Sequence, residues 1–227
     1  MKINWEQSKI LAKGMSLEAK HVLEKLEPFV SEERRSKIDS VLRGRSAHFA
    51  PVLESLYDRG NVSAVMISAE AFGFFKFHIV ETNDKFKESN RVTQGADKWL
   101  EVHKWSRTED CIKALKAEGY KVYATHLSKE AKSFEEIDFS QKTAVIFGNE
   151  KEGVSDVALD MADGNLLLPM SGFTQSFNIS VAGALSCQQA HLSKPPKIKS
   201  EETELMRALY YFKSITWPEK ALQDWFS

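Results

Sequence analysis

The sequence of 227 residues lacks several features that would assign it quickly to one class of protein. It has only two cysteines, Cys111 and Cys187, without metal-ligand spacing or a CxxC motif, so we expect two buried thiols in a cytoplasmic chain. No apolar core follows the N-terminus, so we expect no secretory signal. The most apolar stretch, 64–80, contains four polar or charged side chains, whereas a membrane span needs about 20 predominantly apolar residues. We therefore expect no membrane association.

The sequence also lacks a net charge of either sign, because 31 Lys and Arg residues are offset by 32 Asp and Glu residues. The formal charge of −1 excludes a simple polycation that holds nucleic acid by bulk electrostatics. The charges are nevertheless unevenly distributed. Residues 1–50 contain ten basic and seven acidic side chains (+3), whereas residues 134–165 contain two basic and eight acidic ones (−6). A basic N-terminal arm is thus joined to a more acidic body.

The basic arm, residues 1–48, has apolar side chains at helical spacing. We expect Ser16 and Ser31 each to begin a helix, because serine side chains cap helix N-termini. An ordinary solvated face would explain the charges here. The density of arginines also suggests a phosphate-contacting surface, made of Arg34, Arg35, Arg43 and Arg45.

From Phe49 onward, short apolar strands alternate with helical segments. This alternation predicts an α/β fold with a mainly parallel sheet. The predicted strands are Phe49–Leu56, Phe75–Val80, Lys98–Val102, Tyr120–Thr125, Thr143–Phe147 and Asn165–Leu168. The predicted helices begin at Asn61, at a capping box formed by Ser106 and Glu109, at Ser155 and at Phe177, and the first and second end at Gly73 and Gly119.

The segment 193–200 contains two prolines and three lysines, a composition that indicates a linker. A helical pattern returns over 201–214, and an aromatic tail follows, which we expect to pack on the body or on a partner chain. The chain therefore divides into a basic helical arm (1–48), an α/β domain (49–192) and a linker with a helical extension (193–227).

The common signatures of catalysis are missing. There is no GxGxxG, P-loop, GxSxG or HExxH motif, and the six histidines form no ligand cluster, so we expect no metal. Three unusual segments remain, 58–73, 146–155 and 166–182, each with glycines just beyond a predicted strand. Glycine permits close approach of the backbone to a ligand, and open α/β sheets bind ligands beyond the carboxyl ends of their strands. Turn chemistry would explain any one of them, but three together favour a site.

These segments, which include FGNEKEGVS at 147–155 and LPMSGFTQSFNISVA at 168–182, resemble the SpoU/TrmH family of RNA 2′-O-ribose methyltransferases, in the SPOUT class. The flanking pattern is most similar to the branch that methylates guanosine in the tRNA D-loop. The resemblance, from about residue 31 to the C-terminal helix, implies a SPOUT-like fold. In that fold, helices cover both faces of the sheet, a C-terminal trefoil knot breaks the general rule against knots, and N- and C-terminal helices flank the domain. The resemblance also implies that the cofactor is S-adenosyl-L-methionine, that the partner is RNA, most specifically tRNA, and that the protein is a homodimer.

The resemblance also implies roles for particular residues. Asn61, Ser176 and Asn178 would be catalytic, the last two facing the methyl group and the ribose. The arginines of the arm would contact RNA, and the small residues 182–184 would allow close helix packing between subunits. The walls of the cofactor site would be Thr125, Gly148, Glu150, Gly153, Leu168, Met170, Phe177 and Ser180.

One position departs from the family pattern. The first motif normally reads N-x-x-x-x-x-R, whereas here Asn61 is followed by Ile67 at the arginine position. In the family that arginine is implicated in activating the ribose hydroxyl, and isoleucine cannot take or polarise a proton. Arg59 or an arm arginine would have to compensate. The alternative is a catalytically impaired SPOUT-fold protein that binds RNA or cofactor. The segment 90–95 also differs from the Ser/Gly-rich loop usual in the family.

Overall fold

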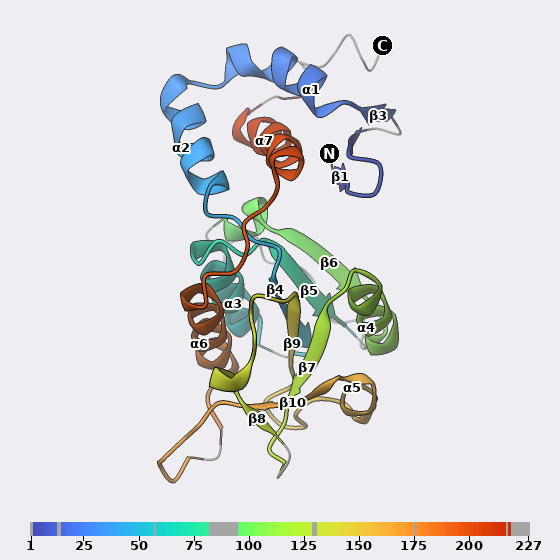
Figure 1. Cartoon of the computed structure of the whole chain (residues 1–227), viewed down its shortest axis with the longest axis vertical. Helices are drawn as coiled ribbons and strands as arrows, with labels where there is room; N and C mark the ends of the chain where they lie inside the picture. Colours follow the sequence, from blue (N-terminus) through green and yellow to red (C-terminus); the bar gives the residue numbers. More distant parts are fainter. Residues whose placement is uncertain are drawn as a thin grey trace. The chain divides into compact units, whose positions relative to one another are not determined.

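The computed structural model describes residues 2–12, 15–56, 58–81, 95–128, 131–174, 176–216 and 218. The chain forms two compact units (Figure 1). The larger is Ser46–Pro196, and the smaller combines Met1–Arg45 with Lys197–Ser227, so the two ends of the sequence share one unit. Residues 90–94 and the aromatic tail from Trp217, apart from residue 218, lie outside the described residues.

The larger unit is built on a seven-stranded sheet in which every described strand pair is parallel. The strand order is β6-β5-β4-β9-β7-β10-β8. The strands are β4 (Phe49–Glu54), β5 (Lys76–Val80), β6 (Glu101–Trp105), β7 (Lys121–Thr125), β8 (Lys132–Ser133), β9 (Thr143–Phe147) and β10 (Gly164–Leu167). The predicted parallel α/β sheet is confirmed, with β6 starting three residues later than expected because Ala96–Trp99 form a 3-10 helix, η2.

Helices cover both faces of this sheet, as predicted. Helices α3 (Arg59–Ala71) and α6 (Ile179–Leu192) share one apolar core with the sheet, together with the 3-10 helix η3 (Phe134–Glu136). Helices α4 (Thr108–Ala117) and α5 (Asp156–Met161) pack in the other core. Successive residues of β9 alternate between the two cores, with Val145 and Phe147 in the first and Ala144 and Ile146 in the second. This alternation explains why the strand is apolar throughout.

Two predicted helix caps in the larger unit are wrong. Asp58, not Asn61, caps α3, because its side chain accepts a hydrogen bond from the Gly60 backbone N–H at 2.7 Å. Asn61 therefore lies inside the helix, and its side chain is free to act elsewhere. The capping box at α4 does not form either, since Arg107 occupies the cap position and its guanidinium bonds Glu109 at 3.2 Å. The Glu109 carboxylate therefore binds the charged Arg107 guanidinium instead of Ser106.

Ser155 caps α5 as predicted, by accepting from the Ala158 N–H at 3.2 Å. Helix α6 begins at Ile179, two residues after the predicted start at Phe177, because Asn178 is its cap. Gly73 and Gly119 follow α3 and α4 with φ of 88° and 83°, in the left-handed region that ends helices.

The smaller unit corrects the expectation of helices throughout residues 1–48. Its first 17 residues include a three-stranded antiparallel sheet of β1 (Lys2–Asn4), β2 (Lys9–Ala12) and β3 (Met15–Leu17). Ser16 lies in β3 and caps no helix. Burial alternates along β2, where Ile10 and Ala12 are buried and Leu11 is exposed, and this period of two suits a strand.

Helices complete the smaller unit. They are α1 (Ala19–Leu26), the 3-10 helix η1 (Glu27–Phe29), α2 (Glu32–Leu42) and α7 (Ser200–Ser214). Ser31 caps α2 as predicted, accepting from the Arg34 N–H at 3.3 Å. Ile38, Leu42, Leu205 and Met206 are among its buried apolar side chains.

Both cysteines are buried thiols, as the sequence predicts. Burial raises the pKa of Cys111 to about 12, and it also raises the pKa of Cys187. A thiol with a raised pKa carries little thiolate near neutral pH, so neither cysteine is suited to nucleophilic chemistry. Among the described residues, no group of three or more His, Cys, Asp or Glu side chains is placed to hold a metal ion. No described helix is long and apolar enough to cross a membrane.

Candidate functional site

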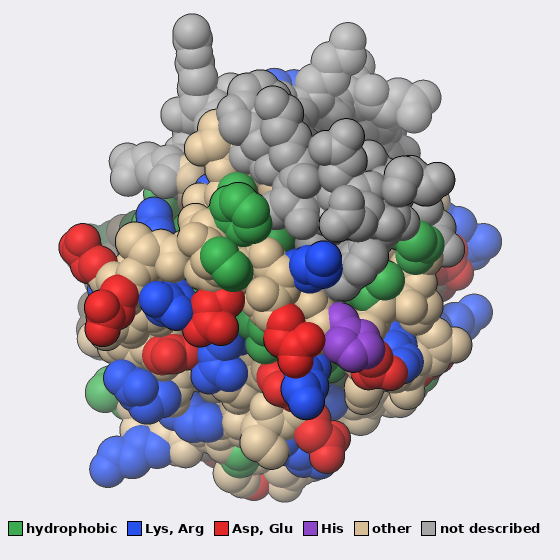
Figure 2. All heavy atoms as spheres, turned by 90° about the horizontal axis from the view of Figure 1, so that it is seen from above, with side chains coloured by type: hydrophobic (Ala, Val, Ile, Leu, Met, Phe, Trp, Pro, Cys, Tyr) green, Lys and Arg blue, Asp and Glu red, His purple; other side chains and the backbone are tan. Residues whose placement is uncertain are grey.

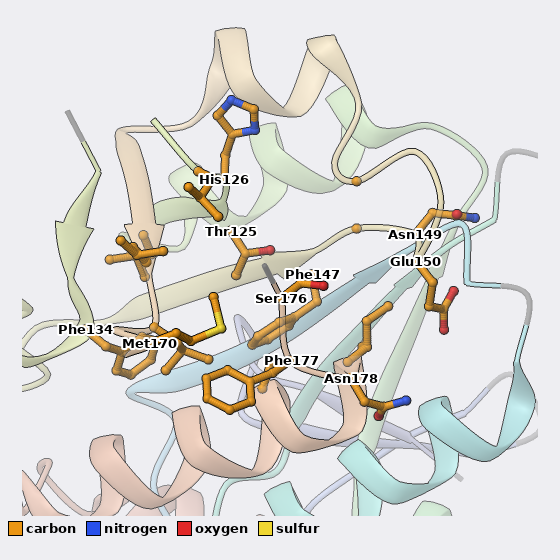
Figure 3. A pocket seen from close by; sticks show the side chains of 18 residues that line it. Thr125, His126, Phe134, Phe147, Asn149, Glu150, Met170, Ser176, Phe177 and Asn178 are labelled. Atoms are coloured by element: carbon orange, nitrogen blue, oxygen red, sulfur yellow. The ribbon is translucent and has the colours of Figure 1, made fainter. Parts of the chain in front are cut away.

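A cavity of about 410 Å³ opens beyond the carboxyl ends of β7, β9 and β10 (Figure 3). Apolar side chains line much of it, among them Phe134, Phe147, Leu166, Met170 and Phe177. Polar groups contribute at the ends of the strands and at the start of α6. An apolar cleft of this volume with a few converging polar groups is typical of a small-molecule site.

The loop after β9 forms one wall of the cavity and closes on itself. The backbone of Asn149 and Gly153 exchanges two hydrogen bonds of 2.9 Å each. A Cβ atom on Gly148 would lie 2.1 Å from the carbonyl carbon of Gly153, so any side chain there collides with backbone. Gly153 has a φ of 73°. Glycine is therefore required at 148 by space and favoured at 153 by backbone conformation.

Asn149 is a residue of this loop that the sequence analysis did not select. Its side chain is buried, and its Nδ2 donates to the carbonyl of Ser55 at 2.9 Å. Its Oδ1 accepts from the backbone N–H of Lys151 at 2.7 Å and of Glu152 at 3.3 Å. Ser55 follows β4 with a φ of 53°, an uncommon conformation for a residue other than glycine. One amide thus ties the loop after β9 to the end of β4.

Glu150 projects from the same loop and meets the first motif. Its Oε1 accepts a hydrogen bond of 2.6 Å from Nδ2 of Asn61, which is 8% exposed on α3. The contact joins positions 89 residues apart, and it explains why Asn61 does not cap its helix. Asn61 does not line the cavity itself but holds a carboxylate that does.

A second carboxylate, Glu54, binds the end of this loop at Ser155. It ends β4 and is only 2% exposed. Its Oε2 accepts from the Ser155 N–H at 2.8 Å, and its Oε1 accepts from the Ser155 hydroxyl at 2.7 Å and from the Thr108 hydroxyl at 2.5 Å. One buried side chain therefore anchors the starts of α4 and α5. The sequence offers no local signal for this role, because the partners lie 54 and 101 residues away.

The third segment supplies the opposite wall. Ser176, Phe177 and Asn178 line the cavity ahead of α6. Asn178 is also the helix cap, since its Oδ1 accepts from the backbone N–H of Ser180 at 2.8 Å and from its hydroxyl at 2.5 Å. This pair of bonds fixes the Asn178 side chain at the cavity mouth. Thr125, at the end of β7, is fixed similarly by donating to the carbonyl of Ile146 at 3.0 Å.

Most of the residues selected from the sequence therefore meet in one place. Seven of the eight assigned to the cofactor wall line the cavity, as do Ser176 and Asn178. Ser180 is not among the lining residues but binds Asn178. The cavity is also lined by four residues that were not predicted from the sequence, Asn149, Phe134, Phe147 and His126. Phe147 and His126 could have been predicted, because they lie at the ends of predicted strands.

The arginines of the arm occupy different environments. Arg34 and Arg43 are exposed, and Arg35 is half-buried with its Nη1 2.7 Å from Glu27. Arg45 is fully buried, with its guanidinium carbon 5.7 Å from the centre of the Tyr210 ring. A buried guanidinium stacked on a tyrosine stabilises the smaller unit and has no access to a phosphate in this structure.

These features define a class of protein: a parallel α/β protein whose binding cavity is made by a glycine-closed loop and a helix N-terminus at the carboxyl edge of the sheet. The chain belongs to the SpoU rRNA Methylase family, which matches residues 49–188.

Relatives extend the match beyond the sheet. The tRNA (guanosine(18)-2′-O)-methyltransferase of Thermus thermophilus is 34% identical over 195 residues, which cover 86% of this chain and 96% of the relative. The crystal structure of the A. aeolicus TrmH/SpoU tRNA modifying enzyme is 27% identical, with a TM-score of 0.72 over 81% of this chain and 97% of that one. The SpoU methyltransferase AviRb of Streptomyces viridochromogenes, solved with AdoMet, shares the fold at 20% identity and a TM-score of 0.56, over 68% and 64% of the chains.

Proposed function

We propose that this protein transfers a methyl group from S-adenosyl-L-methionine to a ribose 2′-hydroxyl of tRNA, in the cytoplasm. The observation that carries the proposal is that two of the sequence motifs line one cavity at the carboxyl edge of the sheet, while Asn61 of the other motif bonds Glu150 in its wall. Family membership and the tRNA-modifying relatives support the substrate class. The trefoil knot implied by the family resemblance is part of the same proposal.

The cavity suits the methyl donor. Its apolar walls, with Leu168, Met170 and Phe177, suit the faces of an adenine ring, and backbone groups of Leu168 and Phe177 would bond the ring edge. The absence of a side chain at Gly148 lets the loop backbone close on itself and form this wall. When bound, S-adenosyl-L-methionine supplies an electrophilic methyl group on a positively charged sulfur. Thr125, Glu150 and Gly153 complete the wall around it.

Each unit by itself contains residues suited to an RNA substrate. Ser176 and Asn178 at the cavity mouth would orient the ribose, and preorganised orientation supplies much of the rate in such transfers. Arg34 and Arg43 are the exposed arm arginines suited to phosphate contacts. On the face in Figure 2, Lys and Arg side chains are interspersed with Asp and Glu. Such a surface positions RNA by individual contacts rather than by bulk charge.

The proposed enzyme is a homodimer that pairs through α6. Val181, Leu185 and Leu192 are 44%, 37% and 63% exposed at positions that share one helical face. Gly183, expected from the sequence to help pack two subunits, instead faces α3 of its own chain, since a Cβ there would lie 2.7 Å from Val65. The apolar face, rather than the small residues alone, is therefore our candidate interface.

The substitution Leu185→Glu tests this interface. A charge buried without a partner between two subunits is costly, so we expect the dimer dissociation constant to rise by at least about 100-fold. Analytical ultracentrifugation measures it, with circular dichroism as the check on folding. Lys113→Glu, an exposed site on α4, is the control and should leave the dimer intact. A dimer that is unchanged by Leu185→Glu would place the interface elsewhere.

The function itself is tested with labelled S-adenosyl-L-methionine and unmodified tRNA. We expect ribose methylation of tRNA, mapped to one nucleotide by nuclease digestion and mass spectrometry. Ile67, half-buried on α3 at the family's arginine position, favours the second candidate, a protein that binds RNA or cofactor without transfer. Cofactor and tRNA binding by calorimetry with no methylated ribose in any tRNA would establish that second candidate.

A further inference from the structure

The proposed transfer needs a group that takes the proton of the 2′-hydroxyl, and Ile67 supplies none. An alcohol is a weak nucleophile until a base removes or polarises its proton. Among the described residues that line the cavity, only Glu150 and His126 carry a carboxylate or an imidazole, the side chains that most often act as general bases. These two side chains are therefore the candidate proton acceptors in the described cavity wall.

We propose that Glu150 is the general base of this protein. This inference rests on the proposed methyltransferase function. In Figure 3, Glu150 lies at the same end of the cavity as Asn178, and Ser176 lies between that end and His126. Asn178 stands at the helix start, where the acceptor ribose is proposed to bind. Position favours Glu150 over His126.

The carboxylate is held in a way that suits a base. Asn61 Nδ2 donates to Oε1 at 2.6 Å, which orients the group through a neutral amide. The partner is a neutral amide, so this contact brings no positive charge to the carboxylate. Glu150 is exposed to the cavity, and a carboxylate has about four lone-pair sites, so one donated bond leaves capacity to accept a proton.

The backbone that carries Glu150 is also fixed. Its neighbour Asn149 bonds the Ser55 carbonyl and two backbone N–H groups of the loop, and the Asn149–Gly153 backbone pair closes the turn. A base held on such a braced loop requires little reorganisation when the substrate arrives. The rigid loop and the Asn61 contact together place one carboxylate at the edge of the cavity.

In the reaction, the ribose 2′-oxygen forms a bond to the methyl carbon while the carbon–sulfur bond breaks. The electron pair of that bond stays on sulfur, which loses its positive charge. The hydroxyl proton passes to a carboxylate oxygen of Glu150 and then to solvent. Atoms and charge balance without a further reactant.

Replacing Glu150 by alanine tests the proposal through chemical rescue. We expect Glu150→Ala to lower the single-turnover rate on tRNA by at least about 100-fold, the usual contribution of a general base. Added formate or acetate should restore part of the rate, more strongly for the more basic carboxylate. Calorimetry should show tRNA binding within about threefold of wild type, because the base acts in the transition state. Glu152→Ala, an exposed carboxylate on the same loop, should keep the wild-type rate.

Three results would overturn it. Full activity of Glu150→Ala would remove Glu150 from the chemistry, and a loss that no carboxylate rescues, with weakened cofactor binding, would assign it a structural role. Loss of transfer in His126→Gln together with retained transfer in Glu150→Gln would give the role to His126. Inactivity of the wild-type protein on every tRNA, by contrast, rejects the proposed function and is distinguishable from each of these.

Discussion

Substituting Gly148 by alanine is expected to abolish cofactor binding. The new Cβ would lie 2.1 to 2.2 Å from the backbone of Gly153 and Val154, and these atoms belong to no flexible side chain that could turn away. The two hydrogen bonds between Asn149 and Gly153 would have to break for the methyl to fit. We expect the Kd for S-adenosyl-L-methionine to rise by at least about 100-fold, or about 2.7 kcal/mol, in isothermal titration calorimetry.

The matched control is Gly172→Ala in the loop on the other side of the cavity. A Cβ there has no neighbour within 4 Å, so the same chemical change should alter the Kd by less than about threefold. Thermal unfolding of both variants separates a local effect from loss of fold. Wild-type affinity in Gly148→Ala would mean that the loop after β9 opens freely and is not a wall of the cofactor site.

The second large effect is expected on stability, from Glu54→Ala. This substitution leaves the Ser155 N–H and the hydroxyls of Ser155 and Thr108 without their buried acceptor. Removal of a buried acceptor costs about 1–3 kcal/mol for each donor left unsatisfied, partly offset by no longer burying a carboxylate. We expect the free energy of unfolding in urea to fall by about 3 kcal/mol.

Two variants sharpen this measurement. Glu54→Gln keeps the shape and one acceptor oxygen, so its loss should be roughly half as large. Asp160→Ala removes an exposed carboxylate from α5 and should change the free energy of unfolding by less than about 0.5 kcal/mol. If Glu54→Ala unfolded at the wild-type urea concentration, the anchoring of α4 and α5 by this side chain would contribute nothing to stability.

Local patterns predicted the larger unit well because they reflect local physics. The strands β4, β5, β7, β9 and β10 lie where segments rich in apolar residues predict them, since a strand covered on both faces is mostly apolar. Glycines with positive φ follow two of the helices where they were expected. The predicted helix caps were wrong where another side chain within a few residues competes for the same hydrogen-bonding group. Asp58 displaced Asn61 as a cap, and Arg107 took the Glu109 carboxylate from Ser106.

Residue types and short spacings were enough to define the parallel α/β class and the three motif segments, and the family resemblance identified the missing arginine at Ile67. The contacts of the polar side chains depend instead on tertiary packing. It paired Asn61 with Glu150, tied Asn149 to Ser55, placed Glu54 beneath two helix starts and buried Arg45 beside Tyr210. These partners are separated by 54 to 165 positions in the chain, and no local pattern specifies which distant groups meet when a sheet assembles. Of the four arm arginines predicted to contact RNA, only Arg34 and Arg43 are exposed. In the cavity wall, Glu150 is a carboxylate whose role in the proposed transfer can be measured.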